Sequence, residues 1–395
     1  MIGLFCFDGP LYKDKDGIYC NVTLTNEMFA RYFCAVDKLY VVVRTFVSDK
    51  SYKELNMKPL ALDNMEVIEV GNFNTIHGFL EEKGKFKESI GELLDHVDLI
   101  FARMPSQTSN VVLEVAQKKH KPYLVEVGGC AWDSFWNHGL LGKAIAPYMY
   151  LCARKNIEKA TFATYVTKEF LQRRYPNKGI TANCSNVYLP QVDETVLEER
   201  LDKIKRVDLT HPVFGQAVNS IDVKYKGEHL IIKAMKTLKK KGILAEFQVV
   251  GPGTGEFLKT EAKRHGVVEQ LKIMGTLQKN EMTEWYKSID VYTQPSKQEG
   301  LPRSVIEAMS VGCAAVGSKL AGIPELLDKE CLFNPDKNDE IVNTLLWVLN
   351  RKNMEAQARV NFKKARKYDL FLIEERRHNI FVQYKEYVLR SKSND

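Results

Sequence analysis

The sequence lacks any apolar run that could cross a membrane. Its apolar stretches fall well short of the roughly 20 residues that a spanning helix needs, so we expect no membrane span. The first ten residues, MIGLFCFDGP, are apolar for only a few positions and contain no basic segment. A secretory signal begins with such a segment, so we interpret this stretch as a buried first strand instead.

Metal-ligand spacing is absent as well. None of the eight cysteines belongs to a C-x-x-C pair, and several lie in apolar segments. We therefore expect reduced, buried thiols in a cytoplasmic protein. No Asp-x-Asp motif stands at the end of a strand that we expect, and we expect no metal cofactor. The sequence also has no short internal repeat and no low-complexity tract.

The excess of positive charge is moderate. The chain contains 57 Lys and Arg against 50 Asp and Glu, a formal net charge of +7, and no polybasic tail carries the excess. An ordinary solvated surface explains such a balance. The alternatives are anionic ligands or an anionic membrane surface, and we expect no nucleic-acid partner.

The composition that remains is typical of a globular protein with two domains. The chain has 395 residues, of which 45% are apolar and 27% are charged, and this length favours two cores of roughly 200 residues each. Apolar runs and helical periodicities alternate along both halves, a pattern that predicts doubly wound, mostly parallel α/β sheets. The expected strands are 2–7, 38–46, 64–70, 97–103, 122–129, 160–167, 243–250, 271–275, 288–296 and 313–318. The expected helices are 24–36, 75–95, 106–119, 141–158, 228–242, 281–288 and the one that begins at Pro302.

The domain boundaries follow from charge and amphipathicity. The charge-rich segment 193–210 is the best candidate for the crossing between the domains, so we expect domains over 1–205 and 206–370. The amphipathic segment 371–395 is expected to form a helix that packs back on the first domain. Ligands of open parallel sheets bind beyond the carboxyl ends of the strands, which makes the cleft between two facing domains the expected site.

The stretch SKQEGLPRSVIEAM places two carboxylates, Glu299 and Glu307, around the start of a helix. Pro302 suits the first helical position, and Asn280 is a suitable cap for the helix before it. Glu307 then lies about one and a half turns inside. Free backbone N–H groups between the two acids can hold an anion, and each carboxylate can accept hydrogen bonds from a diol. A nucleotide sugar has such a shape; two solvent-exposed helix acids are the plain alternative.

An ordered set of motifs makes residues 211–375 resemble a known family. The motifs are VKYKGEHLIIKAM, VVGPGTGE, DVYTQPSKQEG, EGLPRSVIEAM (E-x7-E) and AGIPEL. They are similar to those of the retaining GT-B glycosyltransferases of family 4 (group 1), of the capsular and exopolysaccharide type, and the amino-terminal half resembles them loosely. The resemblance implies two Rossmann-like domains that face each other across a cleft. The first would bind the acceptor and the second the nucleotide sugar, with no metal required.

The resemblance also implies roles for single residues. Glu299 would contact the donor sugar, Glu307 the ribose hydroxyls, and Lys226 the diphosphate. Gly251 and Gly253 would let the backbone approach the nucleotide. An ordinary surface lysine and a plain strand-to-helix turn are the alternatives for Lys226 and the two glycines.

The loop before the helix contributes further expected contacts. Gly300 and Leu301 would present backbone N–H groups to the donor. The arginine that usually precedes the Lys-Gly pair is missing, and Lys224 or Arg303 would replace it.

The amino-terminal half departs further from the family. Gly128 occupies the place of the usual histidine near the reacting centre, so Asp133 and His138 are the candidates to replace it. Trp132 would stack on a sugar ring, although it could equally belong to the core. The segment 8–20 is expected to form a long loop on the acceptor side.

These observations favour a nucleotide-sugar-dependent glycosyltransferase. A nucleotide-sugar epimerase or a phosphorylase on the same frame is the second hypothesis, and a non-catalytic nucleotide-sugar-binding protein is the third. The acceptor is expected to be a glycan or lipid-linked glycan. Segment 137–159 could reach it as a peripheral, basic and aromatic helix on an anionic membrane surface at the cytoplasmic side. Its apolar and basic residues are Leu140, Leu141, Ile145, Tyr148, Met149, Tyr150, Lys143, Arg154, Lys155 and Lys159. An internal helix with a solvated edge is the alternative.

Overall fold

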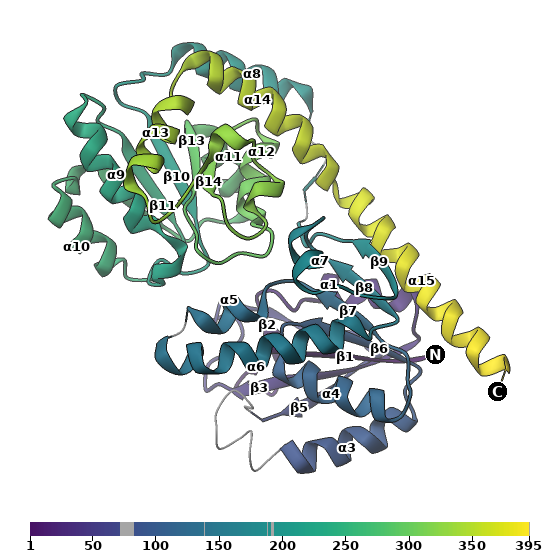
Figure 1. Cartoon of the computed structure of the whole chain (residues 1–395). Helices are drawn as coiled ribbons and strands as arrows, with labels where there is room; N and C mark the ends of the chain where they lie inside the picture. Colours follow the sequence, from purple (N-terminus) through teal and green to yellow (C-terminus); the bar gives the residue numbers. More distant parts are fainter. Residues whose placement is uncertain (72–82, 138, 188, 191–192, 395) are drawn as a thin grey trace. The chain divides into compact units, whose positions relative to one another are not determined.

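The structure is a computed structural model that describes residues 1–395 except 72–82, 138, 188, 191–192 and 395 (Figure 1). The chain divides into two compact units: unit 1 consists of Met1–Cys184 and Glu374–Asp395, and unit 2 of Ser185–Ile373. Each unit is built on a largely parallel sheet with helices. The α/β fold class expected from the alternating pattern is confirmed. Among the described residues, no helix is both long and apolar enough to cross a bilayer.

The sheet of unit 1 is parallel in the order β5-β3-β1-β6-β7-β8-β9. The short strand β2 pairs antiparallel with the carboxyl-terminal end of β1, and β4 pairs antiparallel with β2. The central strands are apolar on both faces, because helices cover both sides of a parallel sheet. The strands are β1 (Ile2–Lys13), β2 (Tyr19–Asn21), β3 (Lys38–Val47), β4 (Lys58–Pro59), β5 (Met65–Val70), β6 (Leu99–Met104), β7 (Leu124–Val127), β8 (Phe162–Tyr165) and β9 (Ile180–Asn183).

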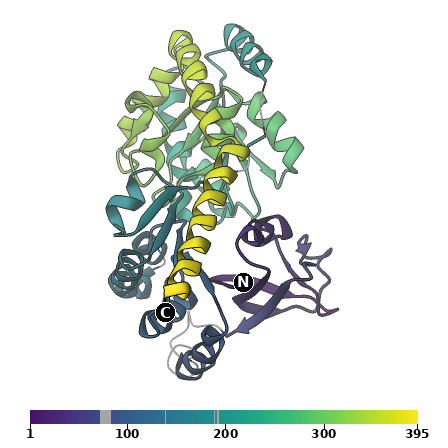
Figure 2. The ribbon, with the colours of Figure 1, turned by 90° about the vertical axis from the view of Figure 1, so that its right-hand side faces the viewer.

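The last helix of the chain contributes to the core of unit 1. The Tyr384 ring packs edge-on against Phe101, and its hydroxyl accepts from Ile100 N (3.0 Å) and donates to Pro122 O (2.9 Å). Figure 2 shows this helix, α15, as one long yellow ribbon. The helices of the unit are α1 (Asn26–Ala30), α3 (Lys83–Asp95), α4 (Gln107–Lys118), α5 (Ala131–Trp136), α6 (Gly139–Glu158), α7 (Phe170–Arg174) and α15 (Leu370–Asn394).

Unit 2 is a parallel sheet in the order β12-β11-β10-β13-β14-β15. The strand order reverses between β10 and β13, so this unit has the doubly wound topology. Its strands are β10 (Val213–Ala217), β11 (Glu246–Val250), β12 (Leu271–Gly275), β13 (Val291–Gln294), β14 (Ala314–Ser318) and β15 (Leu332–Phe333). Its helices are α8 (Glu194–Arg206), α9 (Glu228–Lys240), α10 (Glu256–His265), α11 (Lys279–Ser288), α12 (Arg303–Ser310), α13 (Asn338–Val348) and α14 (Arg351–Ala365).

Several local expectations were wrong. Helix α11 begins two residues earlier than expected, because Gln278 and Glu281 form a reciprocal capping box and Asn280 lies inside the helix. Pro302 is the N-cap residue of α12, with ψ of 112°, and the first helical residue is Arg303. The expected loop at 8–20 is instead the extension of β1 and its antiparallel partner β2. The units divide at 184/185 and 373/374, where the sequence suggested 205/206 and 370/371.

Candidate functional site: a polar cavity at the switch point of unit 2

A polar cavity of about 350 Å³ lies at the carboxyl edge of the unit 2 sheet. It is formed where the strand order reverses, between β10 and β13, and ligands of open parallel sheets bind at such switch points. Its walls come from the ends of β10 and β13, the 3₁₀ turn η2 (Lys224–Lys226), α11 and the start of α12. The lining residues are Ala217, Val218, Asn219, Lys226, Met282, Tyr286, Gln294, Glu299, Leu301, Pro302, Arg303, Ser304 and Glu307.

The structure brings Lys226 and Glu299 together in this cavity. Lys226 Nζ lies 2.8 Å from Glu299 Oε1, and the two side chains are only 14% and 12% exposed. The same oxygen accepts a hydrogen bond from Gln294 Nε2 at 2.9 Å. Gly227 follows the lysine with φ of +83°, and a Cβ there would lie 2.4 Å from Pro295 O. Only glycine fits this turn, which explains the Lys-Gly pair in the sequence.

The start of α12 faces the same cavity. No side chain caps this helix at Pro302, so the N–H groups of its first turn remain available to an anion. Leu301 and Arg303 line the cavity beside them. Gly300 does not line it; its carbonyl accepts a hydrogen bond from Gly322 N at 3.1 Å. The cavity therefore combines a helix N-terminus with two cationic side chains, Lys226 and Arg303.

Glu307 lies on α12 and is held by a tyrosine of α11. Its Oε2 accepts a hydrogen bond from the Tyr286 hydroxyl at 2.9 Å. Burial raises the pKa of Tyr286 well above its ordinary value, and the charge of Glu307 raises it further. The tyrosine consequently stays a hydrogen-bond donor, which fixes the carboxylate while leaving its other oxygen for a ligand.

The remaining candidates of unit 2 do not line the cavity. Lys224 lies over the Phe257 ring, 4.7 Å from its centroid. Gly251 and Gly253 have φ of +153° and +136°, and added Cβ atoms would meet Val218 O at 2.4 Å and Asp222 Oδ2 at 2.6 Å. The carboxylate of Asp222 also accepts hydrogen bonds from the N–H groups of Thr254 and Gly255, the two residues that follow Gly253. These glycines therefore let the turn pack against the segment that follows β10.

The candidates of unit 1 are placed as follows. Asp133 lies in the first turn of α5, with Oδ1 4.0 Å from Arg174 Nη2, and desolvation raises its pKa despite that cation. The Trp132 ring stacks on Trp136 with centroids 4.9 Å apart and planes at 21°. His138 lies outside the described residues. The structure thus places Asp133 beside an aromatic pair.

The residues that the structure describes contain no group of three or more His, Cys, Asp or Glu able to hold a metal ion. The expectation that no Asp-x-Asp motif stands at the end of a strand was wrong. Strand β1 ends at Lys13, and Asp14-Lys15-Asp16 directly follows it. The carboxylate of Asp14 is already engaged in backbone hydrogen bonds, because its two oxygens accept from the N–H groups of Asp16, Ile18 and Tyr52. This carboxylate shapes a loop.

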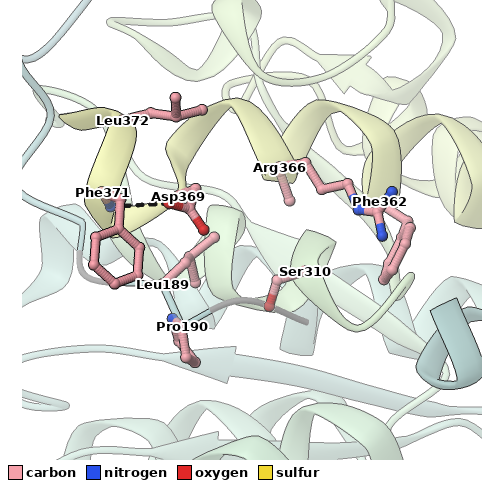
Figure 3. A pocket seen from close by; sticks show the side chains of 9 residues that line it. Leu189, Pro190, Ser310, Phe362, Arg366, Asp369, Phe371 and Leu372 are labelled. Atoms are coloured by element: carbon pink, nitrogen blue, oxygen red, sulfur yellow. Dashed lines mark hydrogen bonds between the residues drawn. The ribbon is translucent and has the colours of Figure 1, made fainter. Parts of the chain in front are cut away.

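A second cavity of unit 2, of about 470 Å³, lies beside the end of α12 (Figure 3). It is lined by apolar side chains with Arg366 and Asp369, and Asp369 Oδ1 accepts from Phe371 N at 2.9 Å. Ser310 contributes to its wall from the end of α12, the helix that also carries Glu307. None of the expected site residues lines it, and the helix N-terminus in its wall, the start of α15, is already capped by Asp369.

Four polar residues of the first cavity were not expected from the sequence: Asn219, Tyr286, Gln294 and Ser304. Of these, Gln294 and Tyr286 hold the two candidate carboxylates. Gln294 ends a buried strand directly before a proline, which is a recognisable signal for a strand-end site residue. Tyr286 carries no such signal, because a tyrosine on the buried face of an amphipathic helix usually belongs to the core.

Comparison with known proteins agrees with this geometry. Residues 218–367 match the family model of glycosyl transferases group 1. The chain is 27% identical to Protein CapJ of Staphylococcus aureus over 98% of this chain and 96% of that protein. It is 32% identical to the amylovoran biosynthesis glycosyltransferase AmsK of Erwinia amylovora over 40% of each chain.

Two solved structures share the fold. WaaG, a glycosyltransferase involved in lipopolysaccharide biosynthesis, superposes with a TM-score of 0.63 at 16% identity and covers 96% of this chain and 99% of that chain. Anabaena HepE in complex with UDP and glucose gives 0.60 at 16% identity, with 94% and 97% covered.

Two Rossmann-like units, one with a polar cavity at its switch point, define the GT-B class of glycosyltransferase architecture. The match over 218–367 is to the family of group 1 glycosyl transferases, and it covers most of the segment that carries the ordered motifs. The resemblance based on the ordered motifs is confirmed.

Proposed function

We propose that this group 1 glycosyltransferase moves a sugar from a nucleoside-diphosphate donor to a glycan or lipid-linked glycan, with retention of the anomeric configuration, in surface polysaccharide synthesis. The observation that carries the proposal is the cavity in which Lys226, Glu299 and Glu307 surround the N-terminus of α12. Carboxylates on both sides of an anion site fit a ligand with hydroxyls at both ends and a diphosphate between them.

Each part of the donor has a partner in the cavity. The diphosphate would lie on the first turn of α12, between Lys226 and Arg303. The ribose would give its hydroxyl hydrogen bonds to Glu307, and the transferred sugar would give its own to Glu299. Gln294 holds Glu299 from the side of β13. Leu301 contributes to the cavity wall, whereas Gly300, Lys224, Gly251 and Gly253 shape the surrounding loops.

The transfer step separates charge. The bond between the anomeric carbon and the diphosphate oxygen breaks, and its electrons leave with the diphosphate. An acceptor hydroxyl forms the new bond on the same face of the sugar, and its proton goes to the departing oxygen. Fixed cations and helix N–H groups that face this oxygen stabilise the charge as it develops. We propose that no metal is needed, because these groups already supply positive charge.

The acceptor is assigned to unit 1. Asp133, with its raised pKa, is the proposed partner of the acceptor hydroxyl, and the Trp132–Trp136 pair offers a stacking surface for a sugar. His138 is kept as the second candidate. The class of acceptor is supported by the descriptions of two similar proteins, in amylovoran and in lipopolysaccharide biosynthesis.

Helix α6 is the proposed contact with a membrane. Leu140, Leu141 and Leu151 are 86%, 61% and 62% exposed, and Lys143, Arg154 and Lys155 are exposed on the same helix. The helix has no acidic residue before its last position, Glu158. Met149, expected on this surface, is buried. An exposed apolar and cationic helix favours a peripheral position on anionic lipid, at the cytoplasmic face, where the free cysteines would stay reduced.

A panel of nucleotide sugars tests the function. A true donor at about 100 times its Kd should add about 2.7 kcal/mol of stability and raise the Tm by several degrees. Incubation of that donor with a lipid-linked glycan should then give a product whose new linkage keeps the donor's anomeric configuration by NMR. Binding without transfer would favour a non-catalytic protein. Conversion of the donor sugar itself would favour an epimerase, and phosphate-dependent cleavage of a glycan would favour a phosphorylase.

A further inference from the structure

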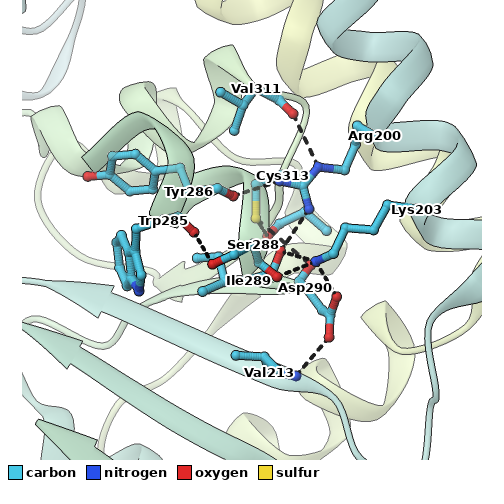
Figure 4. Close-up of polar contacts among 11 residues, drawn as sticks. Arg200, Lys203, Val213, Trp285, Tyr286, Ser288, Ile289, Asp290, Val311 and Cys313 are labelled. Carbon is cyan, nitrogen blue, oxygen red and sulfur yellow. Dashed lines mark hydrogen bonds and ion pairs between the residues drawn. The ribbon is translucent and has the colours of Figure 1, made fainter. Parts of the chain in front are cut away.

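Helix α8 is a charged helix that buries an arginine. Arg200 is 4% exposed, and Ile204 is the other residue of the helix that is buried. The guanidinium donates three hydrogen bonds, and all three go to backbone carbonyls of other elements (Figure 4). Nε donates to Val311 O at 3.2 Å, Nη1 to Ile289 O at 2.7 Å and Nη2 to Tyr286 O at 2.6 Å.

These three carbonyls mark the ends of two helices. Tyr286 lies in the last turn of α11 and Ile289 is its C-cap residue, whereas Val311 is the C-cap residue of α12. The last carbonyls of a helix lack intrahelical partners and carry partial negative charge, so a cation is stabilising there. One guanidinium thus joins two helix C-termini. Gly312 follows with φ of +65°, and a Cβ there would lie 3.2 Å from Arg200 Cγ.

The same two helices carry the Tyr286–Glu307 hydrogen bond of the donor cavity. The planar fork of Arg200 fixes the carbonyl ends of α11 and α12 relative to each other, and a shift of either end would move the tyrosine hydroxyl or the carboxylate. Lys203, one turn later on α8, differs in this respect. It donates to Ser288 O, Ile289 O and Asp290 Oδ1, so among the contacts shown it holds the end of α11 and not that of α12.

From these contacts we propose that Arg200 is a positioning residue of the donor site, which acts on nucleotide affinity through Tyr286 and Glu307. The inference rests on the proposed function, because it concerns the same cavity. Arg200 does not line the cavity, so we expect it to make no contact with a donor bound there. Its effect therefore has to pass through the placement of Tyr286 and Glu307, and this makes the proposal testable apart from a general loss of stability.

The test is a double-mutant cycle with Arg200→Lys, Tyr286→Phe and the double variant. The probe is whichever of UDP, GDP, ADP and TDP binds the wild-type protein most tightly, with Kd measured by calorimetry and folding by Tm. Each single variant should weaken binding about 5- to 20-fold. The double variant should be weakened by less than the product of the two single effects, because both variants disturb the placement of the same carboxylate, Glu307. In kinetics, Arg200→Lys should raise the donor KM more than it lowers kcat.

Two further variants keep the result clear. Lys203→Met is the matched control and should weaken binding less than Arg200→Lys does, since it removes contacts to the end of α11 and leaves the end of α12 held by Arg200. If Arg200→Lys does not fold, Gly312→Ala takes its place, because its Cβ would crowd the stem of Arg200 and leave the charge intact.

Three results would overturn the inference. They are an unchanged Kd in the arginine variant, effects that multiply in the double variant, and an equal loss in Lys203→Met. A wild-type protein that binds none of the nucleotides would remove the proposed function, and this inference with it. A wild-type protein that binds, together with multiplying effects, would remove the inference alone.

Discussion

Lys226 and Glu299 are 73 positions apart in the sequence, yet their charged groups lie 2.8 Å apart in a cavity wall. Both side chains are largely buried, and the desolvation of two charges offsets most of their attraction, so such a pair adds little to stability. The ion pair instead fixes the orientation of both side chains. A lysine held by a carboxylate is already oriented before any ligand binds, and under the proposed function it would face the diphosphate while the carboxylate faces the sugar.

Lys226→Ala should therefore reduce catalysis far more than folding. We expect kcat/KM for the donor to fall at least about 100-fold, because the developing charge on the diphosphate loses a fixed cation. Lys297→Ala is the matched control, since that lysine lies in the same loop as Glu299 but pairs with the exposed Asp336. Steady-state kinetics at several donor concentrations would measure both. Equal rate constants in the two variants would show that Lys226 has no role in the step.

Gly253→Ala should destabilise unit 2. The residue has φ of +136°, and the added Cβ would lie 2.6 Å from both Asp222 Oδ2 and Ile221 Cγ1. We expect a loss of about 2–3 kcal/mol in the free energy of unfolding. Gly266→Ala is the control: its φ is +69° and a Cβ would meet nothing within 4 Å, so strain alone should cost about 1 kcal/mol. Urea unfolding gives both values, and equal losses would contradict the packing argument.

Much of the fold was predictable from periodicity. Most strands of both sheets lie within one to three residues of their expected positions, because buried parallel strands form apolar runs that short loops and helices interrupt. The strands β2, β4, β9, β10 and β15 had no expected counterpart. Other errors fell at capping and pairing, which are decided by single contacts. Gln278 is the N-cap residue of α11 because it forms a capping box with Glu281. Strand β1 continues past Gly9 because β3 pairs with it as far as Lys13.

The pH dependence of stability should show the effect of a buried carboxyl. Glu228 is 1% exposed, and within the described chain its Oε1 has no hydrogen-bond partner. Desolvation raises its pKa from 4.5 to about 7 in the folded protein, against the effect of Lys226. The folded state thus keeps the proton between these values, so stability falls as the pH rises through this window and stays level above it.

Glu228→Gln removes this titration. At pH 8 the variant should exceed the wild-type protein in the free energy of unfolding by up to about 3 kcal/mol, and below pH 4.5 the two should converge. Urea unfolding from pH 4 to pH 8 would measure the difference. A constant difference across the range would mean that Glu228 ionises normally.

Membrane binding should depend on the exposed face of α6. We expect the wild-type protein to sediment with phosphatidylglycerol vesicles at low salt and to be released at about 0.5 M salt, where charges are screened. The double variant Leu140→Glu/Leu151→Glu should stay in the supernatant. Val268→Glu is a control on unit 2, where the valine is also half exposed. Absence of wild-type sedimentation at low salt, or undiminished binding of the double variant, would rule out this contact.

The donor cavity was predictable in part, and the limit has a physical cause. Glu299, Glu307 and Lys226 belong to motifs whose spacing fixes them at a helix start or a tight turn, so the sequence locates them. Tyr286 and Arg200 act through one hydroxyl and one guanidinium that reach across from other helices. Such contacts depend on how the helices pack, and no local pattern encodes them.

Calorimetry of nucleoside diphosphates with Glu307→Gln decides whether this cavity binds the nucleotide of the donor. We expect the wild-type protein to bind at least one of UDP, GDP, ADP and TDP, and Glu307→Gln to weaken this binding by about 1–3 kcal/mol, or roughly 5- to 150-fold. Glu284→Gln changes an exposed acid on α11 and should bind like the wild-type protein. Equal affinity in Glu307→Gln, or no binding of any nucleotide to the wild-type protein, would show that the nucleotide does not bind here.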